Sequence, residues 1–514
     1  LLVFLTACAG EATGKTFRYD IQSPVSNLDP QYATDSAARM VIANIGEGLL
    51  VRDPDGTLSP GVALSYTVSP DGLVYTFTLR EDAGWAGKDP VPVTAHDFVF
   101  AFHRMFNAAA PSPFAADYIH IENARAVLDG APLTGLGVRA EGDYTLVITL
   151  TQKTPLFLEL LASTAAMPCN RTAFEGARGR YGLEKEFVGA NGPFYIEKWT
   201  DTQITLARNE HYVSGTPVLA GGVQFVIGRE KSAQRFLDGN TDITALPFEN
   251  VGEAESIGST IETFEKITWC IVFNQNIKTW GNPLLRQGLA YGLDYDYLAQ
   301  RLTDNLTPTS VLVPPAARVG DTVFRDAADA SSPLTFDPQN AARIFQMGLN
   351  ALEYDSLPPA TFYVPDTDGH ALNMGLVQQS WQKNLSVFVT VQAISPGEIQ
   401  SRFASGDFHI MLMPFSPSDA NVETLLSAFR ESSSQNNFGF YNPRFDDMLN
   451  EAAEQEKTAQ MLKKYIQAEM ILLADAVVIP VYNETTYYAM GKGVSGITVQ
   501  PFGNMLRFKQ ALKS

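Results

Sequence analysis

Cysteine is rare in this chain, which has three cysteines among 514 residues. They are Cys8, Cys169 and Cys270, and none belongs to a Cys-x-x-Cys motif. This excludes a disulfide-dense scaffold and a cysteine-based zinc site. Cys169 and Cys270 could form one disulfide in an oxidising compartment, or they could be two small buried residues. We favour two buried residues, because nothing in their surroundings points to a bridge.

Basic residues are also in short supply. The chain has 37 Lys and Arg against 56 Asp and Glu, which gives a formal net charge of −19. Contacts to phosphate need clustered basic side chains, so nucleic acid and anionic lipid surfaces are excluded as partners. Acidity alone does not point to a cationic substrate, and between the two interpretations we favour a solvated surface that keeps the protein in solution. The length is enough for about two to four domains.

Long hydrophobic runs are missing from the interior of the chain, which excludes an internal membrane span. The start is different. Residues 1–8 end in Leu-Thr-Ala-Cys and look like the remnant of a bacterial lipoprotein signal peptide with its lipobox. We therefore expect lipid on Cys8, an extracytoplasmic location at the bacterial cell membrane, and a natural chain that begins further upstream. The alternative is that Cys8 is a buried residue in an apolar strand.

Catalytic and metal-binding motifs are absent too. The sequence has no Gly-x-Ser-x-Gly elbow, no P-loop and no Gly-x-Gly-x-x-Gly. Its six histidines include no pair at metal-chelating spacing, so we expect core or surface roles for them: His96, His103, His120, His211, His370 and His409. Residues 53–56 and 366–369 resemble calcium loops but lack the other ligands, and we read them as turns. We predict that the protein is no enzyme and needs no cofactor or metal.

What the chain does have is an ordered set of motifs between residues 46 and 104. Residues 75–79 alternate large apolar residues with Thr, as a half-buried strand does. Thr94 suits a helix N-cap, and Asp97 adds negative charge to the first turn. Phe98, Phe102 and Met105 then fall on one helical face. By themselves these features indicate a globular protein with helices and strands.

The order of the motifs says more. Glu-Gly-Leu-Leu at 47–50 is followed by Pro-Gly-Val-Ala at 60–63, Tyr-x-Phe-x-Leu-Arg at 75–80, Trp85, and Pro-Val-Thr-Ala-x-Asp-Phe-Val at 92–99. This series resembles the solute-binding proteins of peptide-type ABC transporters, the three-lobed class that includes oligopeptide-, dipeptide- and nickel-binding proteins. Leu-Asp-Pro at 28–30, Asn-Gly-Pro at 191–193 and the segment 282–290 extend the resemblance over nearly the whole chain.

The resemblance implies a periplasmic-binding-protein-like α/β fold, with two main hinged α/β lobes and an extra α+β lobe. Lobe I would hold 16–47, 174–268 and 483–514, lobe II 48–173, and lobe III 269–482. The implied function is capture of peptides or oligopeptides in a cleft between lobes I and III, followed by delivery to the permease subunits of an ABC importer. We expect a monomer. Two alternatives stay open, namely a non-peptide solute (metal-chelate, sugar or opine) and a sensing or adhesion lipoprotein.

Local patterns predict many of the individual elements. Expected helices cover 36–45, 155–161, 232–237 with Gly239 as the stop, 338–349 with Asp337 as the cap, 372–383, 445–454 and 458–473. Expected strands cover 16–22, 49–51, 75–79, 144–149, 223–227, 242–246, 387–392, 477–482 and 502–508, and another begins at 406–410.

The loop at 411–419 is the main candidate for ligand binding, because it follows a buried strand and open α/β sheets bind ligands at strand ends. In peptide-binding relatives this loop reads Gly-Trp-x-x-Asp, and the Asp pairs with the α-amino group of the peptide. Here Pro414-Phe415 replaces Gly-Trp, Ser418 takes the Asp position, and Asp419 comes one residue late. Asp419 could still reach the amine through a one-residue bulge, or it could be a solvated acid or a helix cap.

Further candidate residues follow from the same resemblance. Positions at which relatives contact ligand are matched by Thr34, Ser36, Ala245, Leu246 and Tyr482, and Phe114 matches a position where an aromatic often faces the cleft. Each of these could instead be an ordinary core residue. Phe415 and Ser416 are candidates as members of the 411–419 loop. Small and apolar side chains at these positions predict a pocket less polar than that of a general oligopeptide binder.

Overall fold

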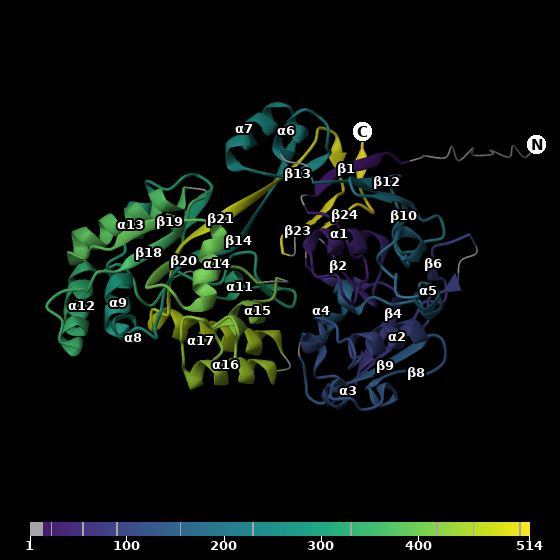
Figure 1. Ribbon diagram of the computed structural model, residues 1–514, viewed down its shortest axis with the longest axis horizontal. Coiled ribbons are helices and arrows are strands. Elements are labelled where there is room, and N and C mark those ends of the chain that lie inside the picture. The colour runs from purple at the N-terminus through teal and green to yellow at the C-terminus, as the bar shows by residue number, and fades with distance from the viewer. Residues whose placement is uncertain are drawn as a thin grey trace, which may run out of the picture. The chain divides into compact units, whose positions relative to one another are not determined.

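The computed structural model describes residues 14–21, 23–53, 56–88, 91–154, 156–228, 231–328, 331–367, 369–417, 420–455, 457–502 and 505–514. These residues form two compact units. Unit 1 takes the described residues up to Glu262, then Tyr487–Gln500 and the last ten residues, and unit 2 takes Thr263–Thr486 with a short stretch from Pro501. The chain leaves unit 1 within β14 (Thr260–Phe273) and returns within β21 (Val478–Met490) (Figure 1).

Unit 1 contains a four-stranded sheet in the order β1-β12-β11-β10. Strand β1 is parallel to β12, and the other neighbours are antiparallel. Helix α1 is joined to β24 by Asn44, whose amide donates to the Leu506 carbonyl at 2.8 Å and accepts from the Phe508 N–H at 3.0 Å. The C-terminal segment therefore completes unit 1. The bounds are β1 (Thr16–Ile21), α1 (Ser36–Ile45), β10 (Phe194–Thr200), β11 (Gln203–Arg208), β12 (Gly222–Ile227) and β24 (Met505–Arg507).

A second sheet in unit 1 is antiparallel throughout and has the order β4-β5-β9-β8. The side chains of Phe77 on β5 and Leu146 on β9 are buried against Phe98 and Phe102 of α2, as the helical periodicity predicts. The Asp97 carboxylate accepts from the Thr94 N–H at 2.8 Å, which confirms the predicted start of α2. The bounds are β4 (Ala63–Val68), β5 (Val74–Leu79), α2 (Ala95–Met105), β8 (Val138–Ala140) and β9 (Thr145–Thr149).

Shorter elements complete unit 1. Gly239, with a φ of 73°, follows the end of α6 as predicted. These elements are β2 (Leu50–Arg52), β3 (Leu58–Pro60), β6 (Gly84–Trp85), β7 (Val91–Pro92), α3 (Ala124–Leu128), α4 (Phe157–Leu161), α5 (Arg171–Gly176), α6 (Ser232–Leu237), β13 (Ile243–Leu246), α7 (Val251–Ser256), β22 (Val494–Ser495), β23 (Thr498–Gln500) and β25 (Leu512–Lys513).

Unit 2 is built on a mixed sheet. Within unit 2 the strand order is β21-β14-β20-β18-β19, with β15 also pairing with β21, and the last residues of β21, which belong to unit 1, pair with β13. Strand β18 is parallel to both β19 and β20, whereas β14 is antiparallel to β20. Because both faces of this sheet are covered, its central strands are continuous apolar runs. The bounds are β15 (Leu306–Pro308), β18 (Thr361–Pro365), β19 (Thr390–Ile394) and β20 (Ile410–Phe415).

The two faces of this sheet have separate cores. Cys270 and Val272 on β14 join one core with α15, α16 and α17, while Ile271 and Phe273 join the other with α9, α12 and α13. Successive side chains of a strand point to opposite faces of the sheet, so neighbouring residues of β14 belong to different cores. The bounds are α8 (Lys278–Gly281), α9 (Pro283–Tyr291), α10 (Tyr295–Ala299), β16 (Arg318–Val319), β17 (Thr322–Val323), α11 (Phe324–Ala327), α12 (Pro338–Leu352), α13 (His370–Leu385), α14 (Pro396–Ser405), α15 (Val422–Leu426), α16 (Pro443–Ala453) and α17 (Thr458–Ala474).

Three predicted strands differ from the structure. The strand expected at 387–392 begins at Thr390, because the Val387 N–H bonds to the end of α13 at the Trp381 carbonyl instead of to a strand. The strand expected at 477–482 continues to Met490, because residues 482–484 pair with β15 and residues 487–490 pair with β13. Among the described residues of the strand expected at 502–508, Met505–Arg507 form β24, whereas Phe502 lies in a turn and Phe508 lies outside the strand. Pro155, expected to begin a helix, lies outside the described residues.

The question of a disulfide is resolved. Cys169 and Cys270 are both buried free thiols, which confirms the interpretation as small buried residues. Cys169 belongs to unit 1 and Cys270 to unit 2.

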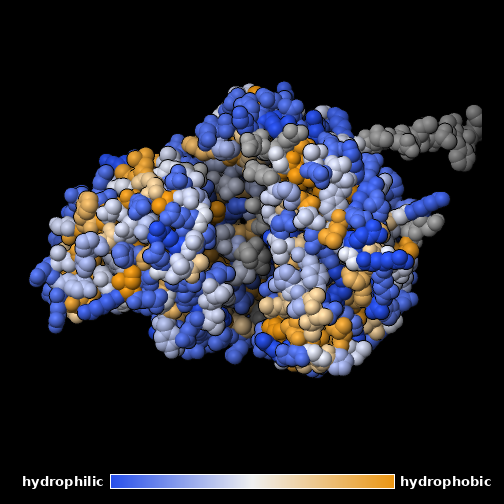
Figure 2. All heavy atoms as spheres, viewed as in Figure 1, coloured by the Kyte–Doolittle hydropathy of each residue, from blue (hydrophilic) through white to orange (hydrophobic). Residues whose placement is uncertain are grey.

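In the described part of the chain, no helix combines the length and the apolar character that crossing a membrane requires. The same residues include no group of three or more His, Cys, Asp or Glu side chains arranged to hold a metal ion. Hydrophilic residues predominate on the face drawn in Figure 2, as the net charge of −19 leads one to expect.

Candidate ligand-binding site

The end of β20 in unit 2 carries the main candidate loop. Residues 410–413 of this strand are buried. After them, Pro414 is exposed, Phe415 is half-buried and Ser416 is exposed. The Phe415 ring stacks on Phe429, with centroids 5.2 Å apart and planes 24° apart. The ring is therefore held in place while part of it stays exposed. Ser418 and Asp419 lie outside the described residues, so a contact between Asp419 and a ligand amine stays a prediction.

A row of polar side chains runs from Phe415 across the neighbouring strands of unit 2. Phe415 is the cross-strand partner of Thr268 on β14. The Thr268 hydroxyl donates to the Asn483 side-chain oxygen on β21 at 2.9 Å, and Asn483 is the partner of Thr307 on β15. Sequence patterns alone did not single out Thr268, Asn483 or Thr307. The usable signal was Thr268 and Asn483 themselves, each a polar residue within a run of buried strand residues.

The row ends at a cavity of about 390 Å³ that lies wholly within unit 2. Glu265 takes part in its wall, and one of its carboxylate oxygens accepts from the Thr307 hydroxyl at 2.7 Å. Most of the other side chains in the wall are polar. They include Tyr295, Thr307, Ser310, Arg325 and Asn483. This cavity can therefore receive a polar group of a ligand.

Tyr482 lies one residue before Asn483, and its side chain points to the opposite face of the sheet. It is fully buried, and its hydroxyl oxygen is 2.8 Å from Nδ1 of His370. The His370 ring in turn lies 4.0 Å from the Trp269 ring. His370 thus has the core role expected of it. Tyr482 therefore packs in the core on the face of the sheet opposite to the Asn483 side chain. A direct contact between Tyr482 and ligand stays a prediction.

In unit 1, Thr34 and Ser36 are exposed on either side of Asp35. The Asp35 carboxylate accepts from the Ala38 N–H at 2.7 Å and caps α1. Ala245 and Leu246 are neighbours on β13, so they point to opposite faces. Ala245 is exposed, whereas Leu246 is buried against Phe236. Thr34, Ser36 and Ala245 are therefore accessible, and the side chain of Leu246 is part of a core.

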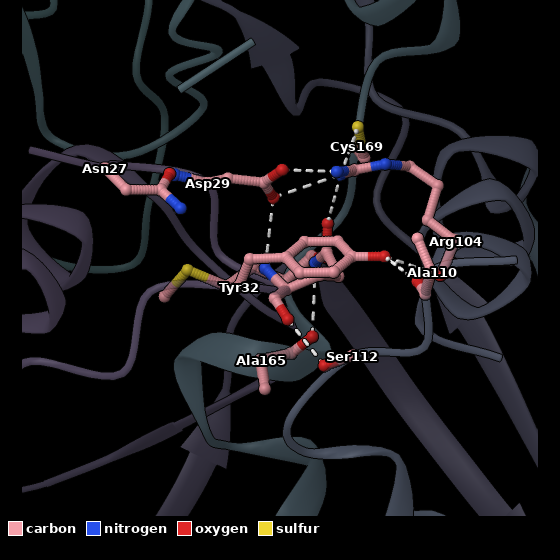
Figure 3. Close-up of polar contacts among 10 residues, drawn as sticks. Asn27, Asp29, Tyr32, Arg104, Ala110, Ser112, Ala165 and Cys169 are labelled. Carbon is pink, nitrogen blue, oxygen red and sulfur yellow. Dashed lines mark hydrogen bonds and ion pairs between the residues drawn. The ribbon is translucent and has the colours of Figure 1, made fainter. Parts of the chain in front are cut away.

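A buried polar network holds the loop that leads to Thr34 (Figure 3). The Arg104 guanidinium pairs with Asp29 and donates to the Gln31 side-chain oxygen at 2.7 Å. The Gln31 amide donates to the Ala165 carbonyl at 3.1 Å. Burial opposes the charge on Arg104, but the Asp29 carboxylate outweighs that effect and holds the pKa of Arg104 above its usual value. The guanidinium is therefore a permanent cation at this position.

Ser112 connects this network to Phe114. Its hydroxyl donates to the Gln31 carbonyl at 2.5 Å and accepts from the Phe114 N–H at 3.1 Å. Phe114 is half-buried and packs on the core of the second sheet. Two candidate segments that lie far apart in the sequence are thus fixed to each other. Sequence patterns did not single out Arg104 and Ser112 as positioning residues, although an arginine on the buried side of α2 was a usable signal.

Comparison with known proteins identifies the class. The sequence model for bacterial extracellular solute-binding proteins, family 5, matches residues 57–437. The chain belongs to this family, which confirms the resemblance seen in the motifs and the prediction of a periplasmic-binding-protein fold.

Individual relatives cover nearly the whole chain. The oligopeptide-binding protein OppA of Bacillus subtilis (strain 168) is 28% identical over 98% of this chain and 97% of its own. The probable deoxycholate-binding periplasmic protein YgiS of Escherichia coli (strain K12) is 26% identical, over 92% of this chain and 89% of its own. Among solved structures, the murein tripeptide-binding protein MppA in its unliganded open form has a TM-score of 0.80 at 25% identity, with 97% of each chain covered.

Proposed function

We propose that this protein binds peptides or oligopeptides outside the cytoplasm and delivers them to the permease subunits of an ABC importer. The observation that carries the proposal is the end of β20, where a held aromatic ring at Phe415 adjoins the hydrogen-bonded pair Thr268 and Asn483. The family membership and the names of the relatives OppA and MppA support it.

A peptide has both polar backbone groups and apolar side chains, and the end of β20 can contact both. Its backbone N–H and C=O groups can pair with an exposed strand end, and such pairing gives affinity without selecting side chains. The exposed part of the Phe415 ring offers an apolar contact for one ligand side chain. Water can fill the space left around smaller side chains. The candidate residues Thr34, Ser36, Phe114, Ala245, Leu246, Ser416, Ser418, Asp419 and Tyr482 remain part of this proposal.

Several further features belong to the same proposal. Lipid on Cys8, which lies outside the described residues, would anchor the protein at the outer side of the cell membrane. We propose a monomer that is divided into lobes I, II and III and joined by a hinge. We also propose that it acts as a binding protein without catalytic activity, since the sequence offers no nucleophile and base in a recognisable pattern.

A second candidate function is binding of a non-peptide solute. The exchange of Gly-Trp for Pro414-Phe415 and the small Ala245 make the predicted pocket less polar, and the relative YgiS is named for deoxycholate. A metal-chelate, sugar or opine belongs to the same alternative. A role in sensing or adhesion is a third possibility, and a permease gene beside the gene for this protein would argue against it.

Native mass spectrometry of the purified protein, followed by denaturation and identification of any released molecule, tests the proposal. Released peptides within a narrow range of lengths would support it. A released non-peptide would move the assignment to the second candidate. An empty protein whose thermal midpoint does not rise with any member of a peptide library would contradict peptide transport.

A further inference from the structure

The cavity beside Asn483 has an unbalanced charge. It contains the carboxylate of Glu265 and the guanidinium of Arg325. Arg325 is already neutralised, because it pairs with Glu469 through a bond of 3.0 Å and a second, shorter one, and its Nε donates to the Val313 carbonyl at 2.8 Å. The carboxylate of Glu469 also accepts the Leu312 and Val313 N–H groups at 3.0 and 2.8 Å.

Glu265 has no such partner. Within the described residues it forms no ion pair, and its side chain accepts one neutral hydrogen bond, from Thr307. The adjacent Lys266 points elsewhere, since its ammonium donates to the Pro501 carbonyl at 2.8 Å. No other described residue donates to the half-buried Glu265 carboxylate, so one of its oxygens has no donor among them. The cavity therefore carries one net negative charge next to hydroxyl groups that can accept further hydrogen bonds.

We infer that this cavity binds a positively charged group of the ligand, with Glu265 as the residue that selects it. The inference rests on the proposed peptide function. A carboxylate and an ammonium or guanidinium group form charge-assisted hydrogen bonds, and these are stronger in a recess than in open water. Two parts of a peptide supply this chemistry, namely the α-amino group and the side chain of Lys or Arg.

The size of the cavity agrees with such a group. Its volume of about 390 Å³ lies at the lower end of the range for small-molecule pockets, about 300 to 1,000 Å³. It connects through Asn483 and Thr268 to Phe415. One ligand can thus place an apolar side chain on the Phe415 ring and a cation at Glu265. That combination predicts a preference for basic or free-amine peptides over blocked, neutral ones.

The test uses the full chain and measures affinity by calorimetry for four synthetic peptides of one length. They combine a free or acetylated N-terminus with either Lys or Ala side chains. Glu265→Gln removes the charge but keeps an oxygen that can accept from Thr307, so folding should be preserved. Asp355→Asn, an exposed acid after α12, is the matched control. We expect Glu265→Gln to weaken cationic peptides by about tenfold to a hundredfold, and Asp355→Asn to leave them unchanged.

The four peptides separate the two sources of the cation. If the α-amine is bound, acetylation weakens binding to the wild type and has little effect on Glu265→Gln. If a Lys side chain is bound, replacing Lys by Ala weakens binding to the wild type and has little effect on Glu265→Gln. Equal affinity of wild type and Glu265→Gln for every peptide would overturn this inference alone. Failure of the wild type to bind any of the peptides, with binding of a non-peptide solute, would overturn the proposed function as well.

Discussion

Arg104 and Asp29, which are 75 residues apart in the sequence, form a buried ion pair beneath the loop that carries Thr34. Breaking a buried pair leaves an uncompensated charge in the protein interior. Arg104→Met should therefore destabilise unit 1 by about 3 to 5 kcal/mol. Denaturant unfolding followed by circular dichroism measures this loss.

The surface pair Arg139 and Glu141 provides the control, since both side chains are more than half exposed. Arg139→Met should leave the unfolding curve nearly unchanged, because solvent screens such pairs. If Arg104→Met is as stable as Arg139→Met, the buried network does not hold the Thr34 loop as described.

Phe415 should matter more for ligand binding than for folding. Phe415→Ala removes the stacked ring beside the polar row, and we expect affinity for a bound peptide to fall by about tenfold. Phe403 packs on the same core of unit 2 and is also half-buried, so Phe403→Ala is the matched control. The two variants should lower the thermal midpoint by similar amounts. Equal affinity for both variants would argue against a ligand contact at Phe415.

Stability should depend on the protonation of His103. Burial lowers the pKa of His103 below its usual value of 6.5, and the nearby Arg171 charge adds to the effect. Between this lowered pKa and 6.5, the unfolded chain binds a proton that the folded chain does not, so stability falls as the pH decreases through this window.

The variant His103→Gln lacks this titration. Unfolding curves measured between pH 5 and 7.5 should show a smaller loss of stability for His103→Gln than for the wild type at the acidic end. Parallel pH dependences of the two proteins would show that His103 titrates normally.

The two buried cysteines should be unreactive while the protein is folded. Burial raises the pKa of the Cys169 thiol to about 11 and raises that of Cys270 well above its usual value. The thiolate is the reactive form, so few molecules carry it at pH 8. We expect Cys169 and Cys270 to react with a thiol reagent only after denaturant is added. Fast labelling of the native protein at either position, mapped by peptide mass spectrometry, would contradict the burial.

Sequence patterns predicted local structure well where a few neighbouring residues decide it. Asp337 accepts from the Gln339 and Asn340 N–H groups at the start of α12, as the Asp-Pro pair indicates. The predicted helix 36–45 has the bounds of α1. The family and its fold also followed from the sequence, because the motifs recur in a fixed order along the chain.

Strand ends were harder to predict. Val387 and Val389 are as buried as strand residues, yet β19 begins only at Thr390, where the parallel partner β18 becomes available. In β21 the polar residues 483–486 interrupt the apolar pattern after Tyr482, yet the strand continues because residues 482–484 pair with β15 and residues 487–490 pair with β13. In both cases the deciding factor is a partner strand that lies far away in the sequence.

The sequence by itself thus determined the helix caps, the family and the position of the β20 loop, because each depends on residues close together or on an ordered set of motifs. Tertiary structure alone decided which polar side chains meet. Thr268 and Asn483 are 215 residues apart, and Arg104 reaches Asp29 across 75 residues. Hydrogen bonds and ion pairs depend on distances of about 3 Å, and only the packing of strands and helices brings such distant residues that close.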